Sequence, residues 1–243
     1  MNLSSLQRTL TSAIIAGVFA GLLISLVQIV TTIPLITEAE TYENQAAASA
    51  ATDHHSAPAG TAATEAPAAH SHGDEDSWAP EDGAERLTYT FLSNVIAGVG
   101  FALLLGAAMT MRGRAITVQS GALWGVSGFL VFSLLPAAGL PPEVPGTQGA
   151  PVELRQMWWF LTVACSAVAL ALIAFKPSWI WRGVGIALLL LPHVIGAPHP
   201  EVASSTAPAA LAAEFAILTM ISSAIFWVMI GSVSGFVSEK FQS

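Results

Sequence analysis

Charged residues are scarce in this sequence. Only 10% of its 243 residues are Asp, Glu, Lys or Arg, whereas 53% are hydrophobic. A soluble globular domain carries about 25% charged residues. The composition therefore excludes an ordinary soluble domain and indicates a membrane protein.

Cysteine and catalytic motifs are almost missing as well. Cys165 is the single cysteine, which excludes an intramolecular disulfide, and we interpret it as a small residue inside a helix. The sequence contains no HExxH, no G-x-S-x-G and no phosphate-binding P-loop. We therefore expect no enzymatic activity, no organic cofactor and no nucleic-acid partner, and the chain by itself cannot drive transport with ATP.

Long apolar runs are abundant. A helix needs about 20 apolar residues to cross about 30 Å of hydrocarbon. Six runs meet this need, at residues 10–36, 89–111, 115–140, 157–175, 179–197 and 210–237. The predicted fold class is therefore all-α, a polytopic membrane protein with six transmembrane helices in the lipid bilayer. The fifth run is short and contains Pro192, so five spans are the alternative.

Basic residues set the expected orientation. With the N-terminus inside, the cytoplasmic side holds most of the basic residues, namely Arg8, Arg112, Arg114, Lys176, Arg182 and Lys240. The outside holds only Arg86 and Arg155. This bias predicts that both termini are cytoplasmic. We interpret the first run as a permanent helix, with a cleaved signal as the alternative.

One long polar segment interrupts the apolar sequence. It divides the chain into residues 1–36 with the first helix, an external loop at 37–87, and a five-helix bundle at 88–243. The loop is rich in Ala, Pro, Ser and Thr, so we expect it to be disordered. It contains DHH and HSHGDED, which supply His54, His55, His70 and His72. Such a segment is either a metal-capture device or a solvated tether.

Two stretches resemble each other. WGVSGFLVFSLLPAAGLPPEV ends at Val144 and RGVGIALLLLPHVIGAPHPEV ends at Val202. The similarity indicates internal duplication of a helix hairpin. Tight cytoplasmic turns predict that the second helix pairs with the third, and the fourth with the fifth. Proline near the outer end of each outward-running helix predicts broken helices around an outer vestibule.

Small and polar residues inside the spans predict helix packing. The pairs Gly17 and Gly21, Gly121 and Gly125, and Gly231 and Gly235 each fit the close-approach pattern of membrane helices. The polar residues Gln28, Asn94 and Gln119 are expected to join helices rather than to touch a substrate.

A few residues could bind a metal. His193 follows Pro192 inside a span, where a histidine needs a partner or a cavity, and imidazole suits borderline divalent metals. His199 follows in the next loop. Glu214 could face His193, or could be a first-turn acid favoured by the helix dipole. Glu40 and Glu43 could flank the vestibule or be solvated.

Four stretches resemble one known family. They are AGVFAGLLISLVQIVTTIPLITEAETYE, DGAERLTYTFLSNVIAGVGFALLL, GALWGVSGFLVFSLLPAAGLPPEVPG and LLLLPHVIGAPHP. The chain is similar to the CbtA family of predicted cobalt transporter subunits. The resemblance implies a bacterial inner-membrane protein acting in cobalt uptake, linked to cobalamin-related functions, with a small His-rich single-helix membrane protein (CbtB-like) as partner.

We therefore predict the membrane subunit of a divalent cobalt importer. Divalent cobalt would be the transported ion, and nickel or zinc would suit the same ligands. The metal residues would be His193, His199, Glu214, Glu40, Glu43 and the four loop histidines. The alternative is a non-transporting accessory or metal-sensing subunit. A haem protein would need paired axial ligands, and only one histidine lies within a span.

Overall fold

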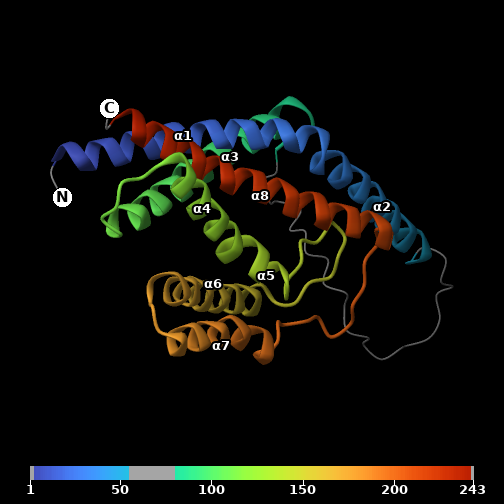
Figure 1. Cartoon of the computed structure of the whole chain (residues 1–243). Helices are drawn as coiled ribbons and strands as arrows, with labels where there is room; N and C mark the ends of the chain where they lie inside the picture. The colour runs from blue at the N-terminus through green and yellow to red at the C-terminus, as the bar shows by residue number, and fades with distance from the viewer. Residues whose placement is uncertain (1–2, 55–79, 242–243) are drawn as a thin grey trace.

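The chain is almost entirely helical. The computed structural model describes residues 3–54 and 80–241. Its helices are α1 (Leu3–Val30), α2 (Thr32–His54), α3 (Ala84–Met111), α4 (Val118–Phe129), α5 (Leu135–Ala137), α6 (Val152–Phe175), α7 (Trp179–Ile195) and α8 (Ala209–Lys240), with a π-helical stretch, η1 (Leu130–Leu134), between α4 and α5 (Figure 1). The described residues form no strand, only an isolated bridge between Thr147 and Ser205. The all-α prediction is confirmed.

Within the part of the chain that the structure describes, five helices are long and apolar enough to cross a membrane. They are Gln7–Val30, Ala84–Met111, Val118–Ala137, Val152–Phe175 and Ala209–Lys240. α7 is apolar but has only 17 residues, which at 1.5 Å a residue is about 26 Å. A polytopic membrane protein is confirmed, and the predicted count of six spans depends on this shorter helix.

A turn at Thr31 separates α1 from α2. Pro34 explains it, because a proline cannot donate to the carbonyl four residues earlier and its ring crowds that carbonyl, here Val30. α2 then continues to His54, so the disorder expected from residue 37 is wrong up to residue 54. The Ala-rich sequence of this segment favours helix. His55, His70 and His72 lie outside the described residues.

Glycine-rich faces hold the long helices together. α1 packs on α3, where a Cβ on Gly98 would overlap the backbone oxygen of Gly17. α4 packs on α8, where a Cβ on Gly121 would overlap the backbone oxygen of Gly231, and the reverse is also true. The predicted close approaches are confirmed.

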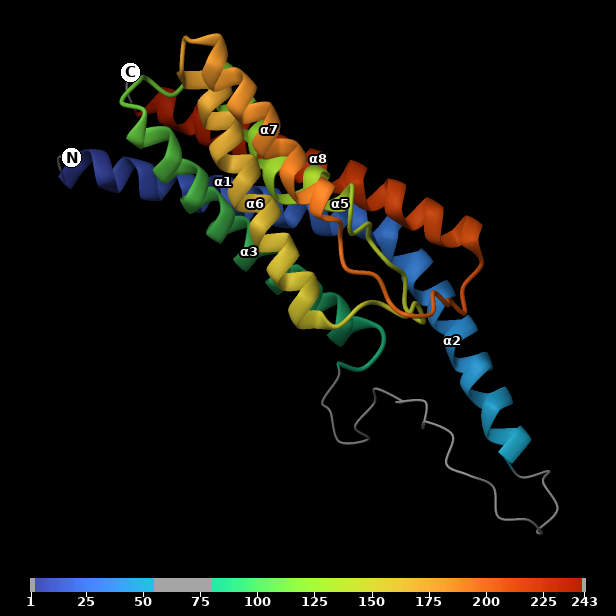
Figure 2. The ribbon, with the colours of Figure 1, turned by 90° about the horizontal axis from the view of Figure 1, so that it is seen from below.

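These contacts revise one predicted hairpin. α6 and α7 pair as expected, but α3 and α4 touch only weakly, because α3 lies on α1 and α4 on α8. Figure 1 shows the α6–α7 pair as a separate layer beside α4 and α5, and in Figure 2, seen from below, this pair lies in front of the other helices. The sequence similarity of the two stretches therefore does not extend to similar packing.

The prolines of the two similar stretches also differ in effect. Before Pro136, the chain forms the π-helical stretch Leu130–Leu134 and the helix ends at Ala137. A π-helix accommodates one extra residue in a turn. α7 instead continues through Pro192 to Ile195 and ends at Gly196, whose φ is 89°.

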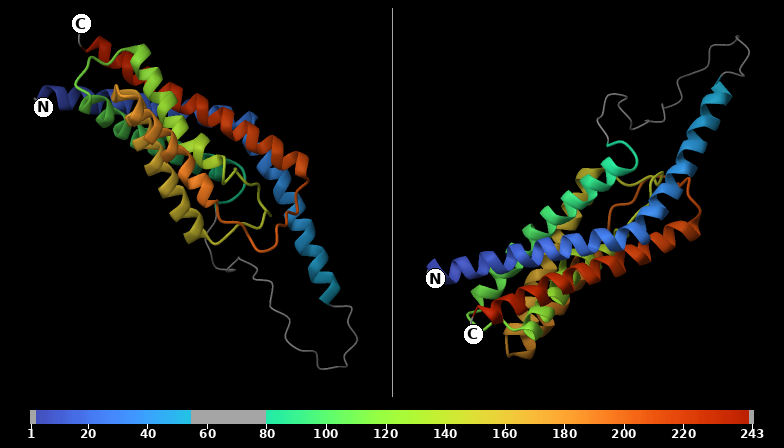
Figure 3. Two further views of the ribbon diagram at one scale, coloured as in Figure 1. Left: turned by 60° about the horizontal axis from the view of Figure 1, so that its bottom comes forward. Right: turned by 90° about the horizontal axis from the view of Figure 1, so that it is seen from above.

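The bundle has two distinct ends. The "turn end" holds both termini and the short connections 112–117 and 176–178 (Figure 3). The "loop end" holds α2 and the connections 138–151 and 196–208. These two loops are joined, since the Gln148 N–H donates to the Ser204 carbonyl at 2.9 Å and the Thr206 N–H to the Gly146 carbonyl at 3.2 Å.

Candidate functional site

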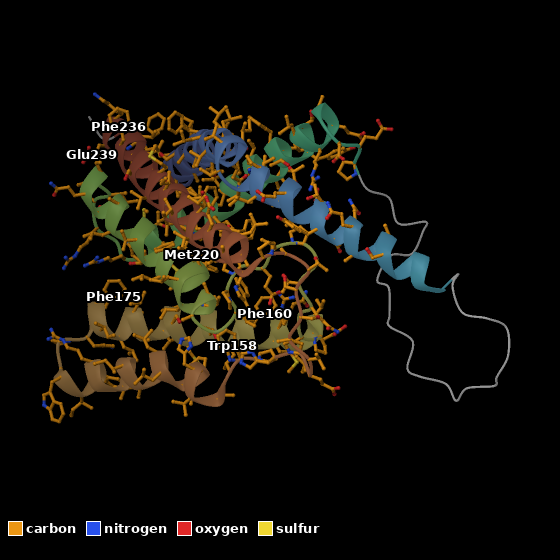
Figure 4. The ribbon with its side chains drawn as sticks, turned by 90° about the vertical axis from the view of Figure 1, so that its right-hand side faces the viewer. Trp158, Phe160, Phe175, Met220, Phe236 and Glu239 are labelled. Carbon is orange, nitrogen blue, oxygen red and sulfur yellow. The ribbon has the colours of Figure 1, made fainter. Side chains whose placement is uncertain are left out.

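His193 lies near the loop end of α7, half-buried against α6. Its ring makes an edge-to-face contact with Trp158, with the ring centroids 5.7 Å apart. The Trp158 indole N–H donates to the Pro192 carbonyl oxygen at 3.1 Å, so the same tryptophan fixes the backbone beside the histidine. Figure 4 shows Trp158 at the α6–α7 layer. The imidazole therefore has a packing partner.

The other predicted ligands in the described residues lie on other elements than His193 does. His199 is exposed in the 196–208 loop, and Glu214 is exposed in the second turn of α8. Glu43 is exposed on α2. His54 is the last residue of α2.

Glu40 has a partner that the sequence did not predict. Its carboxylate forms an ion pair with both terminal nitrogens of Arg86, one of them at 2.9 Å. Arg86 also pairs with Asp82 at 3.1 Å. The Glu40–Arg86 pair joins α2 to the start of α3 and cancels the charge of one predicted ligand.

The predicted metal residues therefore do not form a ready-made cluster. Across residues 3–54 and 80–241, no group of three or more His, Cys, Asp or Glu side chains is arranged to hold a metal ion. The metal role of each predicted residue stays a prediction.

A polar cavity lies inside the bundle instead. Its volume is about 290 Å³, and it lies between α1, the start of α2, α3 and α8. We call it the polar pocket, after its polar lining residues Gln28, Thr32, Asn94, Thr219, Ser222 and Ser223. Phe215, Phe226 and aliphatic side chains complete the wall. Asn94 and Thr219 each lie ten residues from the loop-end start of their helices, about 15 Å inward.

Asn94 organises one wall of the polar pocket. Its amide nitrogen donates to the Ser25 hydroxyl at 3.0 Å and to the Gln28 side-chain oxygen at 2.7 Å. Ser25 donates its own proton to the Gly21 carbonyl at 2.9 Å, so its oxygen can only accept from Asn94. This network fixes the amide orientation, and it confirms that Gln28 and Asn94 join α1 to α3.

A larger cavity opens between the layers. It measures about 720 Å³ and is lined by residues of η1, the 138–151 loop, α6 and α8, among them Trp159, Phe160, Met220 and Ser223. We call it the outer pocket. Its charged residues are Glu143 and Arg155, which pair at 3.0 Å. Ser223 lines both cavities.

Sequence reasoning missed the α8 side of the polar pocket. Thr219, Ser222 and Ser223 follow an i, i+3, i+4 spacing, which places three hydroxyls on one face of an apolar helix. That spacing was the available signal. The partners from α1 and α3 carry no local signal that they meet this face.

Comparison with known proteins identifies a family. The family model described as "Probable cobalt transporter subunit (CbtA)" matches residues 6–239. No curated protein and no solved structure matches the chain.

Proposed function

This chain belongs to the probable cobalt transporter subunit (CbtA) family, and on that basis we propose that it is the membrane component of a divalent cobalt importer. The loop end would face the outside and collect the cation. The bundle would provide the path across the membrane.

The separation of charge along the bundle carries this proposal. The turn end holds Arg8, Arg112, Arg114, Lys176, Arg182 and Lys240. The loop end holds nearly all described acids, among them Glu38, Glu40, Glu43, Glu81, Asp82, Glu143, Glu153, Glu201 and Glu214. Basic residues favour the cytoplasmic side, and an acidic outer surface raises the local cation concentration. The inner membrane with cytoplasmic termini is the matching location.

The direction of transport follows from the same orientation. A membrane potential that is negative inside favours entry of a dication by about 2.3 kcal/mol per charge per 100 mV. The proposed importer therefore needs no ATP of its own. His193, His199, Glu214, Glu40 and Glu43 would lie along the entrance, together with the loop histidines.

Two matched α8 variants test the entrance. Glu214→Gln removes a charge at the loop end, and Glu239→Gln removes one at the turn end. The Glu239 carboxylate accepts from the Val118 N–H at 3.1 Å, and an amide keeps that bond. Loss of one surface charge should weaken the apparent cobalt affinity about two-fold, whereas Glu239→Gln should have no effect. Radiolabelled cobalt uptake at equal expression measures both.

His193→Ala extends the test to ligation. Loss of a direct ligand should reduce uptake more than ten-fold. This is a larger effect than the one expected when only the electrostatic attraction of one surface charge for the cation is lost. Uptake at the wild-type level in both His193→Ala and Glu214→Gln cells would contradict the proposed role of these residues at the entrance. Competition by nickel and zinc in the same assay defines the metal.

One observation favours a second function, a non-transporting accessory or metal-sensing subunit. Within the described ranges the protein has no ready-made metal cluster, so binding could depend on the loop histidines and a partner protein. Replacing His54, His55, His70 and His72 together by alanine separates the two functions. An accessory subunit should lose all cobalt-dependent phenotype, whereas an importer should lose only apparent affinity.

A further inference from the structure

Two helices of the bundle separate toward the turn end. α6 packs on η1 and α5, but it makes no comparable contact along α4. Figures 1 and 4 show α4 and α6 diverging from α5 toward the turn end. Only long side chains can therefore reach from one of these helices to the other at that end.

An apolar face of α6 is left uncovered beside α4. The Trp124 and Phe175 rings meet with their centroids 6.1 Å apart, so Phe175 marks the face of α6 that is turned toward α4. Val168 lies seven residues earlier, about two turns, and therefore on the same face. It is 51% exposed, which shows that α4 does not cover this face. We call the surface with Val168 and Phe175 the α4–α6 face.

Basic residues gather where the α4–α6 face reaches the turn end. Arg112 and Arg114 lie in the connection between α3 and α4, Lys176 directly follows Phe175, and all three are exposed. The Arg112 guanidinium lies over the Phe175 ring, 4.8 Å from its centroid. This contact brings the α3–α4 connection to the end of α6, so the three positive charges are close together.

These three basic residues have no ion-pair partner in the described part of the chain. The loop-end arginines Arg86 and Arg155 differ, since both are in ion pairs. Glu239 is the one described acid at the turn end, and its carboxylate accepts from the Val118 N–H at 3.1 Å instead. The preference of basic residues for the cytoplasmic side explains why they lie at this end, but not why they gather beside one apolar face. Their counter-charge has to come from another molecule.

An apolar face that ends in unpaired cations suits a phospholipid. The acyl chains cover the apolar side chains, and the phosphate accepts from the guanidinium groups, whose geometry matches phosphate oxygens. Basic sites between membrane helices hold acidic lipid headgroups in this way. A zwitterionic lipid would bring its own positive charge next to the basic residues, so an anionic headgroup fits better.

We propose that the α4–α6 face binds an anionic phospholipid, with its phosphate on Arg112, Arg114 and Lys176 and an acyl chain along Phe175 and Val168. The cation–π contact with Phe175 holds the Arg112 guanidinium in place for the phosphate. The bound lipid would connect the α6–α7 pair to α4 at the turn end, where protein contacts are few. This site is independent of the metal that the protein transports.

Lipid binding to the purified full chain in detergent tests the site. Native mass spectrometry compares added phosphatidylglycerol with phosphatidylcholine of the same acyl chains. The site variant is Arg112→Gln with Lys176→Gln. The matched control is Arg8→Gln with Arg182→Gln, which removes two charges from the same end of the bundle. These two arginines lie on α1 and α7, and neither helix packs on α4.

We expect the wild type to bind phosphatidylglycerol about ten-fold more tightly than phosphatidylcholine. The site variant should bind phosphatidylglycerol roughly 30-fold more weakly, whereas the control should stay within about three-fold of wild type. Arg112→Lys with Lys176→Arg keeps both charges and should keep most of the binding. Phe175→Leu keeps an apolar side chain but releases Arg112, and should weaken binding about three-fold.

Three results would overturn the lipid site. Equal affinity for the two lipids would mean that the headgroup charge is not recognised. Equal losses in the site variant and the control would mean that the whole turn end attracts lipid through its net charge alone. A folded site variant that binds phosphatidylglycerol as the wild type does is the third. Thermal unfolding without added lipid checks the fold, and if the site variant is unfolded, Phe175→Leu decides by the presence or absence of its three-fold loss.

Discussion

Hydrogen-bond partners separate two kinds of polar residue in this bundle. Asn94 donates to Gln28 and Ser25 and so joins α3 to α1, and the structural role of Gln28 and Asn94 was predictable from their presence in apolar helices. Thr219 is buried without such a partner among the described residues. Sequence could not show this, because an unsatisfied group is defined by what the rest of the fold fails to supply.

Ser234→Ala should stabilise the protein. The Ser234 hydroxyl is buried and has no partner among the described residues, so removing it relieves a desolvation cost of about 1 kcal/mol. Unfolding in a mixed-detergent titration measures the change. Ser25→Ala is the comparison, and it should lower stability because Ser25 holds Gly21 and Asn94. A destabilised Ser234→Ala protein would mean that the hydroxyl has an unseen partner.

Arg86→Gln should strengthen cobalt capture. Arg86 pairs with Glu40 and Asp82, so its removal exposes carboxylate charge at the loop end. The apparent affinity in cobalt uptake should rise about two-fold. Arg182→Gln, which removes a basic residue at the turn end, should change nothing. Weaker uptake in Arg86→Gln at equal protein level would argue against cation capture by the acidic surface of the loop end.

At the scale of elements, glycine spacing was the most informative part of the sequence. It correctly indicated close helix contacts, because Gly17 of α1 packs against the backbone of α3 and Gly121 of α4 packs against the backbone of α8. It could not name the partners, since a short turn does not force two helices to pack along their length. The predicted pairing of α3 with α4 was wrong for this reason.

Gly98→Ala and Gly100→Ala should differ in sign. A Cβ at Gly98 would overlap the Gly17 backbone, whereas one at Gly100 meets nothing within 4 Å. Gly98→Ala should therefore cost about 1–3 kcal/mol of stability. Gly100→Ala should be neutral or gain up to about 1 kcal/mol from helix propensity. The unfolding midpoints of the two purified proteins measure this difference in stability. Equal midpoints would refute the α1–α3 packing.

At the scale of the whole molecule, the sequence predicted the charge difference between the two ends of the bundle and the end at which each connection lies. The two ends of the bundle differ in charge as the assignment of the loops predicted. The reason is that successive connections between the long helices lie at opposite ends of the bundle. The polar pocket could not be predicted from the sequence, because its walls come from α1, α3 and α8, which are far apart in the chain. The charged candidates, led by Glu40 and Glu214, were easier to notice than neutral hydroxyls.

Cysteine labelling should show the orientation. In a Cys165→Ser background, Val202→Cys is placed in the exposed 196–208 loop and Ala115→Cys in the exposed turn-end connection. A membrane-impermeant maleimide added outside should label Val202→Cys in intact cells and Ala115→Cys only after lysis. The opposite pattern would place the acidic loop end in the cytoplasm and contradict its proposed role in collecting cations from outside.

Cobalt uptake in the native host tests the central claim most directly, because any partner protein is then present. Initial uptake of radiolabelled cobalt is compared in wild-type cells, in cells lacking this chain, and in cells with the chain restored. The account predicts that uptake falls on deletion, returns on restoration, and collapses when the membrane potential is dissipated. Uptake that is unchanged by deletion would contradict it.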